Sequence, residues 1–173
     1  MLNPRRLAIL AASAAAILAV SSCGLQQDLS HIPNLGSGPT GPATPITAPT
    51  LSGTQFDWAS THGHVIVLDF WGSWCGPCRL EQAGLNQMYT EFAPRGVIFL
   101  GADMREPNAV DGVAYERDFH VGYPSVSDAS EVIASEYNVF DPPTLIVIDT
   151  HSNIVDRFLS TTTGLSADLR RLT

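Results

Sequence analysis

The sequence predicts one α/β domain, in which helices flank a central mixed β-sheet. Three apolar runs rich in β-branched residues, at residues 65–70, 97–102 and 145–148, have the length and composition of buried strands. Segments with helical patterns separate these runs, and strand–helix alternation in one short chain is typical of layered α/β domains. The chain has 173 residues, of which 45% are hydrophobic, and this is enough for one domain with its own core.

The first 22 residues have the pattern of an export signal. Arg5 and Arg6 precede an apolar run at residues 7–20, which is short for a bilayer span and has the length of a signal-peptide core. Small residues then lead to Cys23, and this arrangement resembles a bacterial lipobox. The resemblance implies cleavage before Cys23 and lipidation of its thiol. The alternatives are an uncleaved anchor and a soluble secreted protein with a free thiol.

Residues 23–50 are rich in proline, glycine, serine and threonine and show no hydrophobic periodicity. Such a composition is typical of an extended, flexible segment that cannot bury enough apolar surface to fold. We therefore expect a lipid-anchored tether at 23–50 and a folded domain at 51–173.

Turn, strand and helix patterns follow one another along the predicted domain. A short hairpin is expected at residues 51–56, before the first buried strand. Helices are expected at 75–92, 108–119, 130–137 and 166–172, the last with Ser166 as its N-cap. Further strands are expected at 123–126 and at 154–159, the second antiparallel to its predecessor because only a turn at 151–153 separates them.

Two cysteines stand where the first buried strand gives way to the first helix, in the run Trp74-Cys75-Gly76-Pro77-Cys78. Unpaired backbone N–H groups and the positive end of the helix dipole favour a thiolate at a helix start. Pro77 fits the first helical turn, where a missing N–H removes no hydrogen bond. We expect Cys75 to be the exposed attacking thiol, and Cys78, one turn deeper, to resolve the mixed disulfide.

Composition excludes several other kinds of chemistry. Nine arginines, no lysine and 17 acids give a formal charge of -8, so the basic surface of a nucleic-acid-binding protein is absent. Without lysine there is no Schiff-base chemistry. A structural zinc site needs four ligands, and the sequence has neither a second CxxC motif nor a zinc-finger histidine pair. We therefore expect no metal and no organic cofactor.

Four segments, VIVLDFWGSWCGPCRLE, GVIFLGADMRE, YPSVSD and PPTLIVID, together resemble the TlpA/ResA group of the thioredoxin superfamily. Members of this group are membrane-anchored thiol–disulfide oxidoreductases, and the resemblance covers residues 51–173. It implies a thioredoxin fold with a Cys75–Cys78 redox disulfide. The stretch from Asp103 to Pro142 is longer than a minimal thioredoxin needs, which matches the helical insertion of the group.

The resemblance also carries over three positions near the cysteines. Pro143, after Pro142, matches the cis-proline that faces the CxxC pair in this fold. Asp69 matches the buried acid of cytosolic thioredoxins, and Glu81 matches the acid that ResA-type proteins use. The presence of both acids leaves open which one manages the proton of Cys78. We expect Asp69 to be the main base and Glu81 a lesser electrostatic influence, unless Glu81 is only a solvated helix carboxylate.

The resemblance implies an extracytoplasmic enzyme that reduces disulfides of exported proteins, for example apocytochrome c during cytochrome c maturation. A transmembrane thiol donor of the CcdA type would recharge it. Contacts with the client are expected from Trp74, Gly76, Pro77, Pro142 and Pro143. The alternatives are an oxidant of the same fold that forms disulfides, a Cu(I) chaperone that uses the two thiolates, and a thiol peroxidase.

Overall fold

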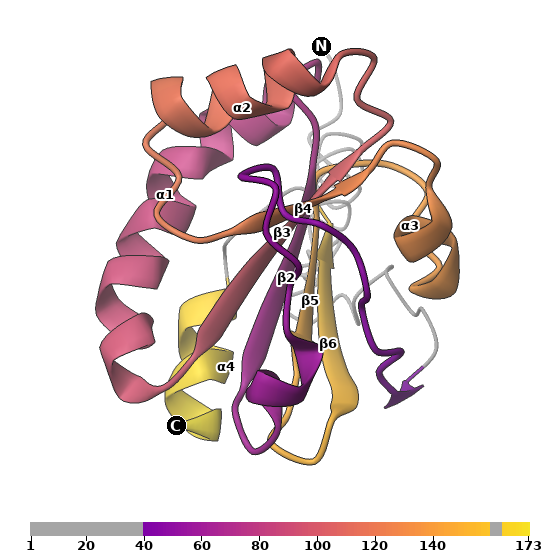
Figure 1. Ribbon diagram of the computed structural model, residues 1–173. Coiled ribbons are helices and arrows are strands. Elements are labelled where there is room, and N and C mark those ends of the chain that lie inside the picture. Colours follow the sequence, from indigo (N-terminus) through magenta and orange to yellow (C-terminus); the bar gives the residue numbers. More distant parts are fainter. Residues whose placement is uncertain (1–39, 160–163) are drawn as a thin grey trace, which may run out of the picture. The chain divides into compact units, whose positions relative to one another are not determined.

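The computed structural model describes residues 40–159 and 164–173. Within these ranges it confirms the α/β prediction, with a six-stranded mixed sheet in the order β1-β6-β5-β2-β3-β4 (Figure 1). The strands are β1 (Gly41–Pro42), β2 (Ile66–Trp71), β3 (Ile98–Met104), β4 (Ser125–Asp128), β5 (Thr144–Ile148) and β6 (Asn153–Leu159). The helices are α1 (Gly76–Phe92), α2 (Ala109–Asp118), α3 (Val132–Glu136) and α4 (Leu165–Leu172), with 3-10 turns η3 (Trp58–Thr61) and η4 (Ala93–Arg95).

Strand β2 lies in the middle of the sheet, parallel to β3 and antiparallel to β5. All six of its residues are buried, because helices and connecting segments cover both faces of the sheet. This explains why its sequence is an almost continuous apolar run, interrupted only by Asp69. The end of β2 is therefore a rigid support for the residues that follow it.

Two apolar layers hold the sheet between its helices. On one face, α1 and α4 contribute Leu85, Phe92, Leu165 and Leu169 to a buried cluster. On the other face, α3 and the N-terminal segment pack against alternate residues of the same strands. Figure 1 shows α1 and α4 on one side of the sheet and α3 on the other.

The ordered domain starts earlier in the chain than predicted. Strand β1 pairs with β6, and Ile46 is 1% exposed in the core beneath α3. Further along, Thr50 forms a bridge to Val126 of β4, and the Leu51 N–H donates to the Ser125 carbonyl over 2.8 Å. We call residues 41–51 the N-terminal strap, because this segment pairs with both edge regions of the sheet.

The tether prediction is therefore wrong for residues 41–50, and the reason lies in their composition. Proline and glycine suit an extended segment that packs through one large side chain, Ile46, and such a segment has no periodic pattern. The predicted hairpin at 51–56 is reduced to a turn closed by one bridge between Pro49 and Gln55. Residues 1–39, which include the predicted signal peptide, Cys23 and most of the tether, lie outside the described residues.

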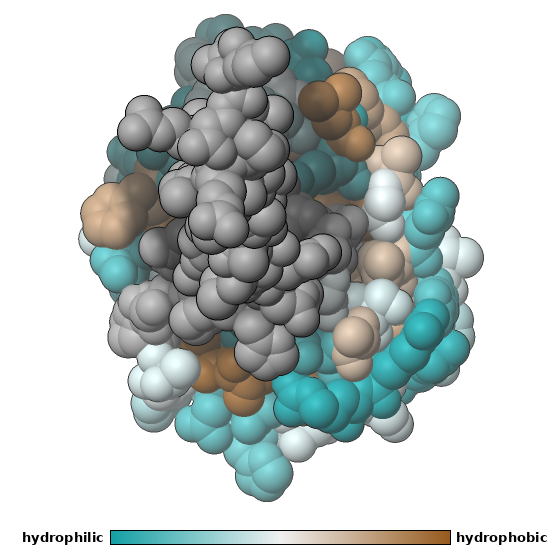
Figure 2. All heavy atoms as spheres, turned by 180° about the vertical axis from the view of Figure 1, so that it is seen from behind, coloured by the Kyte–Doolittle hydropathy of each residue, from teal (hydrophilic) through white to brown (hydrophobic). Residues whose placement is uncertain are grey.

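The other predicted elements are confirmed, with differences at their ends. Helix α3 is shorter than the predicted segment at 130–137, and α4 begins after Gly164, so Ser166 is not its N-cap. The predicted insertion, residues 103–142, contains α2, β4 and α3. Among the described residues, no helix is both long enough and apolar enough to cross a bilayer. Figure 2 shows hydrophobic side chains in separate patches among hydrophilic ones on the face turned away in Figure 1.

Candidate active site

A disulfide joins Cys75 and Cys78 at the start of α1, with 5.3 Å between their Cα atoms. Cys75 is the N-cap of the helix, and its sulfur accepts the backbone N–H of Cys78 over 3.1 Å. Pro77 lies in the first turn, as predicted. The Cys75 sulfur therefore occupies the place where a helix binds negative charge.

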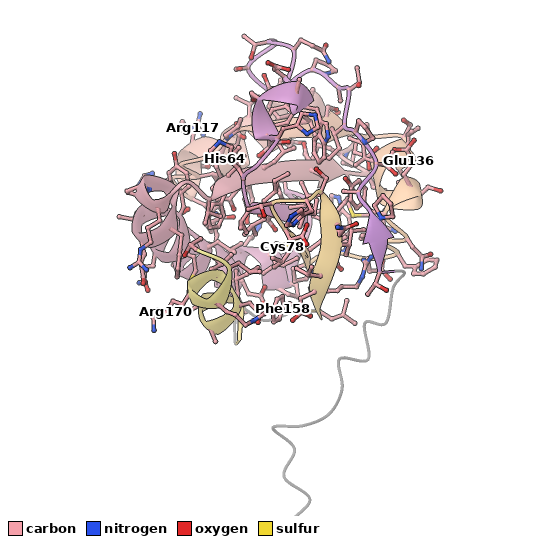
Figure 3. The ribbon with its side chains drawn as sticks, turned by 90° about the horizontal axis from the view of Figure 1, so that it is seen from below. His64, Cys78, Arg117, Glu136, Phe158 and Arg170 are labelled. Carbon is pink, nitrogen blue, oxygen red and sulfur yellow. A yellow bond between two sulfur atoms is a disulfide. The ribbon has the colours of Figure 1, made fainter. Side chains whose placement is uncertain are left out.

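Both cysteines are buried in the disulfide state, each 3% exposed. The expectation that Cys75 would be exposed is therefore wrong for this state. The physical reason is a cluster in which both sulfur-bearing residues pack with Trp71 of β2 and Tyr115 of α2. Figure 3 likewise shows Cys78 in the interior, whereas Arg117 and Arg170 lie at the periphery. The two sulfurs therefore differ in their place on the helix and not in exposure, since Cys75 is the N-cap and Cys78 lies within the first turn.

Stacked aromatic rings and a chain of hydrogen bonds support the disulfide. The Tyr115 ring lies 4.3 Å from the Trp71 ring, and its hydroxyl donates to Gln82 over 3.2 Å. Gln82 donates to the Tyr123 hydroxyl over 3.0 Å, and Tyr123 donates to the Asp69 carboxylate over 2.8 Å. This buried chain links α2, α1, the segment before β4 and the central strand β2.

Asp69 lies on β2 and is 1% exposed. Burial raises the pKa of its carboxyl to about 7, because an ionised group loses its hydration there. The hydrogen bond from Tyr123 acts in the opposite direction, and the negative charge of Glu81 adds to the rise. Near neutral pH this carboxyl can therefore both accept and release a proton.

Glu81 is half-buried on α1, one turn beyond Cys78. Burial raises the pKa of its carboxyl, and its Oε2 is buried without a hydrogen-bond partner among the described residues. Because its charge acts on Asp69, the two acids form one coupled system. Glu81 is thus more than a solvated helix carboxylate, although its environment is far less enclosed than that of Asp69.

The Trp74 side chain, beside the disulfide, is 44% exposed, and two contacts hold its indole ring. Its indole N–H donates to the Met104 carbonyl over 3.2 Å, and the Arg105 guanidinium lies 4.9 Å from its ring centre. Arg105 also pairs with Glu131 over 3.3 Å and with Asp141 over 2.7 Å. The exposed face of Trp74 is therefore held in one orientation by the segment after β3.

The peptide bond between Pro142 and Pro143 is cis, as the resemblance implied. Pro143 is buried directly before β5, and the next residue, Thr144, pairs with Phe70 of β2. Through Asp141, the same Arg105 that covers Trp74 contacts this proline loop. The loop and Trp74 therefore belong to one surface near the disulfide.

A hollow of about 330 Å³ lies beside the loop before Cys75. Its lining includes three aromatic side chains, Trp74, Tyr115 and Phe119, and the charged side chains of Arg79 and Asp118. Within residues 40–159 and 164–173, no group of three or more histidine, cysteine or acidic side chains is placed to hold a metal ion. The site is thus a disulfide next to a small, partly apolar recess.

Sequence reasoning found the cysteines and both acids but missed Gln82, Tyr115 and Tyr123. Gln82 lies four residues after Cys78, so its helical spacing was a usable signal. The two tyrosines come from the insertion and reach the site only through the fold. No local pattern in the sequence identifies them.

A CxxC disulfide at a helix N-terminus in this fold defines a thiol–disulfide oxidoreductase of the thioredoxin superfamily. The chain belongs to the AhpC/TSA family, whose model matches residues 39–157.

Comparisons with individual proteins agree with this class. The chain is 31% identical to the thiol–disulfide oxidoreductase ResA of Geobacillus kaustophilus over 117 residues, which cover 68% of this chain and 66% of that protein. The fold is similar to a secreted disulfide oxidoreductase of Mycobacterium tuberculosis, with a TM-score of 0.66 and 27% identity over 74% of this chain and 96% of the other. It is also similar to the thioredoxin domain of an oxidoreductase from Bacteroides vulgatus, with a TM-score of 0.70 and 22% identity over 79% of this chain and all of that domain.

Proposed function

We propose that this protein reduces disulfides of exported proteins from the outer side of the cell membrane. The observation that carries the proposal is the position of Cys75, whose sulfur caps α1, in a site that a hydrogen-bond chain from Tyr115 connects to the buried Asp69 carboxyl. The Cys75 thiolate attacks one sulfur of the client disulfide, and a client thiolate leaves. Cys78 then loses its proton and attacks the Cys75 sulfur, which closes the Cys75–Cys78 disulfide and releases the second client thiolate.

The second step needs a base inside a poorly hydrated site. Asp69 is proposed for this role, because its pKa of about 7 lets it take up a proton near neutral pH. The hydrogen-bond chain through Tyr123 and Gln82 holds its carboxyl in place. Glu81 tunes the same step through its charge.

The acids around the disulfide support reduction over oxidation. A strong oxidant of this fold owes its high potential to a stabilised thiolate. Here Asp69 and Glu81 add negative charge near the cysteines and oppose the thiolate when they are ionised. The opposing effects of the helix N-terminus and the acids give a moderately reducing pair. Electrons therefore pass from the protein to its client.

The reduction potential tests this direction. We expect equilibration with glutathione and dithiothreitol buffers to give a value near that of thioredoxin, about -270 mV. A potential near that of a strong oxidant, about -120 mV, would overturn the reducing direction and favour disulfide formation in the client.

Membrane attachment is proposed to depend on Cys23. Its support is the lipobox-like sequence at the end of the apolar run. Cys23→Ala should release the protein from membranes or leave it unprocessed, with its disulfide exchange unchanged. Ser22→Ala is the matched control and should stay bound. A processed Cys23→Ala protein that remains on membranes would contradict lipid attachment.

The proposed client is a protein that presents an accessible disulfide between two cysteines close in its sequence, such as the haem-binding CxxC of apocytochrome c. Each turnover consumes two electrons, so a transmembrane thiol donor of the CcdA type must return them. Cys78→Ser should stall the reaction at the mixed disulfide and retain the client on Cys75. Recovery of apocytochrome c on Cys78→Ser, and not on the double variant that also lacks Cys75, would identify the client. Its absence among the trapped proteins would exclude it.

A further inference from the structure

A second pair of buried acids lies behind the loop that leads into Cys75. Asp103 is near the end of β3 and is 1% exposed, and Glu106 follows three residues later and is 7% exposed. Neither residue takes part in the steps described above. Buried carboxyls are costly unless they are paired or protonated, so their presence needs an explanation.

Glu106 holds Ser73, which is two residues before Cys75. The Ser73 backbone N–H donates to Oε2 and the Ser73 hydroxyl donates to Oε1, each over 2.9 Å. Together with the hydrogen bond between Trp74 and the Met104 carbonyl, these contacts fix the Ser73–Trp74 loop to the end of β3. The orientation of this loop in turn sets the direction from which a partner can approach the Cys75 sulfur.

Asp103 has a different environment, because neither of its oxygens has a donor among the other described residues. Helix α2 packs directly on it, since a Cβ added to Gly112 would lie 2.2 Å from Oδ2. Glycine inside a helix costs about 1 kcal/mol relative to alanine, and this close approach accounts for it. A carboxyl without donors is stable there when it carries a proton, and it can then donate to Glu106.

The charges that act on Asp103 favour that protonated form. Its pKa is raised to about 8, by burial first, then by the charge of Glu106, the hydrogen bond with Glu106 and the charge of Glu116 on α2. Its neighbours in the sheet register are Trp71 on β2 and Ser127 on β4, which carry no charge. The charges that bear on Asp103 are therefore those of Glu106 and Glu116.

We propose that Asp103 and Glu106 share a proton and act as positioning residues for the loop that presents Cys75. While Asp103 is protonated, its O–H holds Glu106 and Glu106 holds Ser73. When Asp103 loses this proton to solvent, two carboxylates face each other, Glu106 is pushed away and the Ser73–Trp74 loop is released. This inference goes beyond the proposed function, because it concerns the pH range in which Cys75 reacts and not the client or the direction of electron flow.

The rate of alkylation of Cys75 in the reduced protein, measured with iodoacetamide from pH 5 to 10, tests the proposal. Cys78→Ser serves as the background, so that one active-site thiol is measured. The rate constant should rise as the Cys75 thiol ionises and then fall about two- to threefold as the pH passes about 8, since the displaced loop no longer presents the Cys75 sulfur in its reactive orientation. Asp103→Asn should abolish the fall, because asparagine donates to Glu106 at every pH.

Two further variants make the outcome decisive. Glu106→Gln should also abolish the fall, because a neutral amide is not repelled by an ionised Asp103. This variant tests the proposal on its own if Asp103→Asn does not fold. Asp128→Asn is the matched control, since Asp128 is equally buried on β4 but caps α3, and it should keep the fall. The ionisation of Asp69 is common to all these proteins. Retention of the fall without Asp103 or Glu106, or its loss in Asp128→Asn, would overturn the proposal. No client is present, so this result is independent of the reducing direction.

Discussion

At the residue scale, the backbone N–H groups at the start of α1 stabilise the thiolate form of Cys75. Its sulfur accepts the Cys78 N–H from the first turn of this helix. Two acids, Asp69 on β2 and Glu81 on α1, limit how far this stabilisation can go when they are ionised. The two effects determine which sulfur attacks and how reducing the pair is.

The first prediction concerns the order in which the thiols react. In the reduced protein Cys75 should be alkylated about tenfold faster than Cys78, because its thiolate is stabilised by the helix N-terminus. Timed reaction with iodoacetamide, followed by tandem mass spectrometry that locates the label on Cys75 or on Cys78 within the one peptide that contains both, measures this order. Cys75→Ser should lose disulfide exchange completely. Equal alkylation rates, or turnover by Cys75→Ser, would contradict the assignment.

The second prediction concerns proton transfer from Cys78. Asp69→Asn should slow resolution of the mixed disulfide about a hundredfold and leave the first attack by Cys75 nearly unchanged, because asparagine cannot accept a proton. Stopped-flow release of a client trapped as the mixed disulfide measures this step. Glu81→Gln removes the same charge from the same site and should slow it less. If Glu81→Gln is the slower variant, the roles of the two acids are reversed.

The third prediction follows from the pKa of Asp69. Below about pH 4 the carboxyl is protonated in both folded and unfolded protein; between pH 4 and 7 only the unfolded chain releases the proton. The stability of the wild type relative to Asp69→Asn should therefore fall by about 1.4 kcal/mol per pH unit across this window, while the contribution of Asp103, whose pKa is also raised, is common to both proteins. Urea unfolding of the two oxidised proteins at pH 4, 5.5, 7 and 8 measures the difference. A difference that does not grow between pH 4 and 7 would refute the raised pKa.

At the element scale, Arg105 connects three segments around the disulfide. It covers Trp74 and pairs with Asp141 of the proline loop and Glu131 before α3. These segments lie far apart in the sequence, and this one guanidinium contacts all three. Its role is to keep the exposed surface beside the cysteines in one shape.

The fourth prediction tests that role. Arg105→Ala should slow reduction of a protein disulfide about three- to tenfold, because Trp74 loses its cation–π contact, and should leave reaction with small disulfides nearly unchanged. Insulin and oxidised glutathione are suitable substrates for the comparison. Arg95→Ala is the matched control, since Arg95 lies 5.0 Å from the Phe92 ring at the far end of α1. Equal losses with both substrates would show that Arg105 acts on the cysteines themselves.

The accuracy of the predicted elements follows from how each one is stabilised. Strands β2, β3 and β5 were predicted well, because burial on both faces gives a continuous apolar run in the sequence. Helix α1 was predicted well, because its apolar residues recur with helical spacing after a recognisable N-terminus. Helix α3 was overestimated, since its five residues are held largely by Asp128, whose carboxylate accepts the Ile133 and Ala134 N–H groups. In the site, cysteines and acids could be predicted from spacing. Tyr115 and Glu106 could not, because only the folded insertion brings them there.

At the scale of the whole molecule, the N-terminal strap is the largest departure from the sequence-based expectation. It crosses the sheet from β6 to β4 and contributes Ile46 to the core and the Thr44 carbonyl as acceptor for Tyr137. The family match begins at residue 39, in agreement with this boundary. A domain cut at residue 51 would leave part of its core uncovered.

The fifth prediction concerns the contribution of the strap to stability. Ile46→Ala should lower the free energy of unfolding by about 2–4 kcal/mol, because it leaves a cavity in a fully enclosed layer. Urea unfolding measures the change, and the reduction potential should stay the same, since the disulfide lies in another cluster. Val110→Ala, at a position 73% exposed, should change stability by less than about 0.5 kcal/mol. A similar small change at Ile46 would show that the strap is dispensable.

The strap also determines what the sheet offers to other polypeptides. An open sheet normally ends in rows of unpaired N–H and C=O groups, which can add a strand from another chain. Here Gly41–Pro42 covers part of β6, and residues 49–51 bond to Ser125 and Ser127 on β4, so both borders of the sheet are partly occupied by the same short segment. Molecules of this protein at high local density are thereby protected from joining edge to edge. Loss of the strap would expose these borders and favour aggregation, even if the disulfide remained intact.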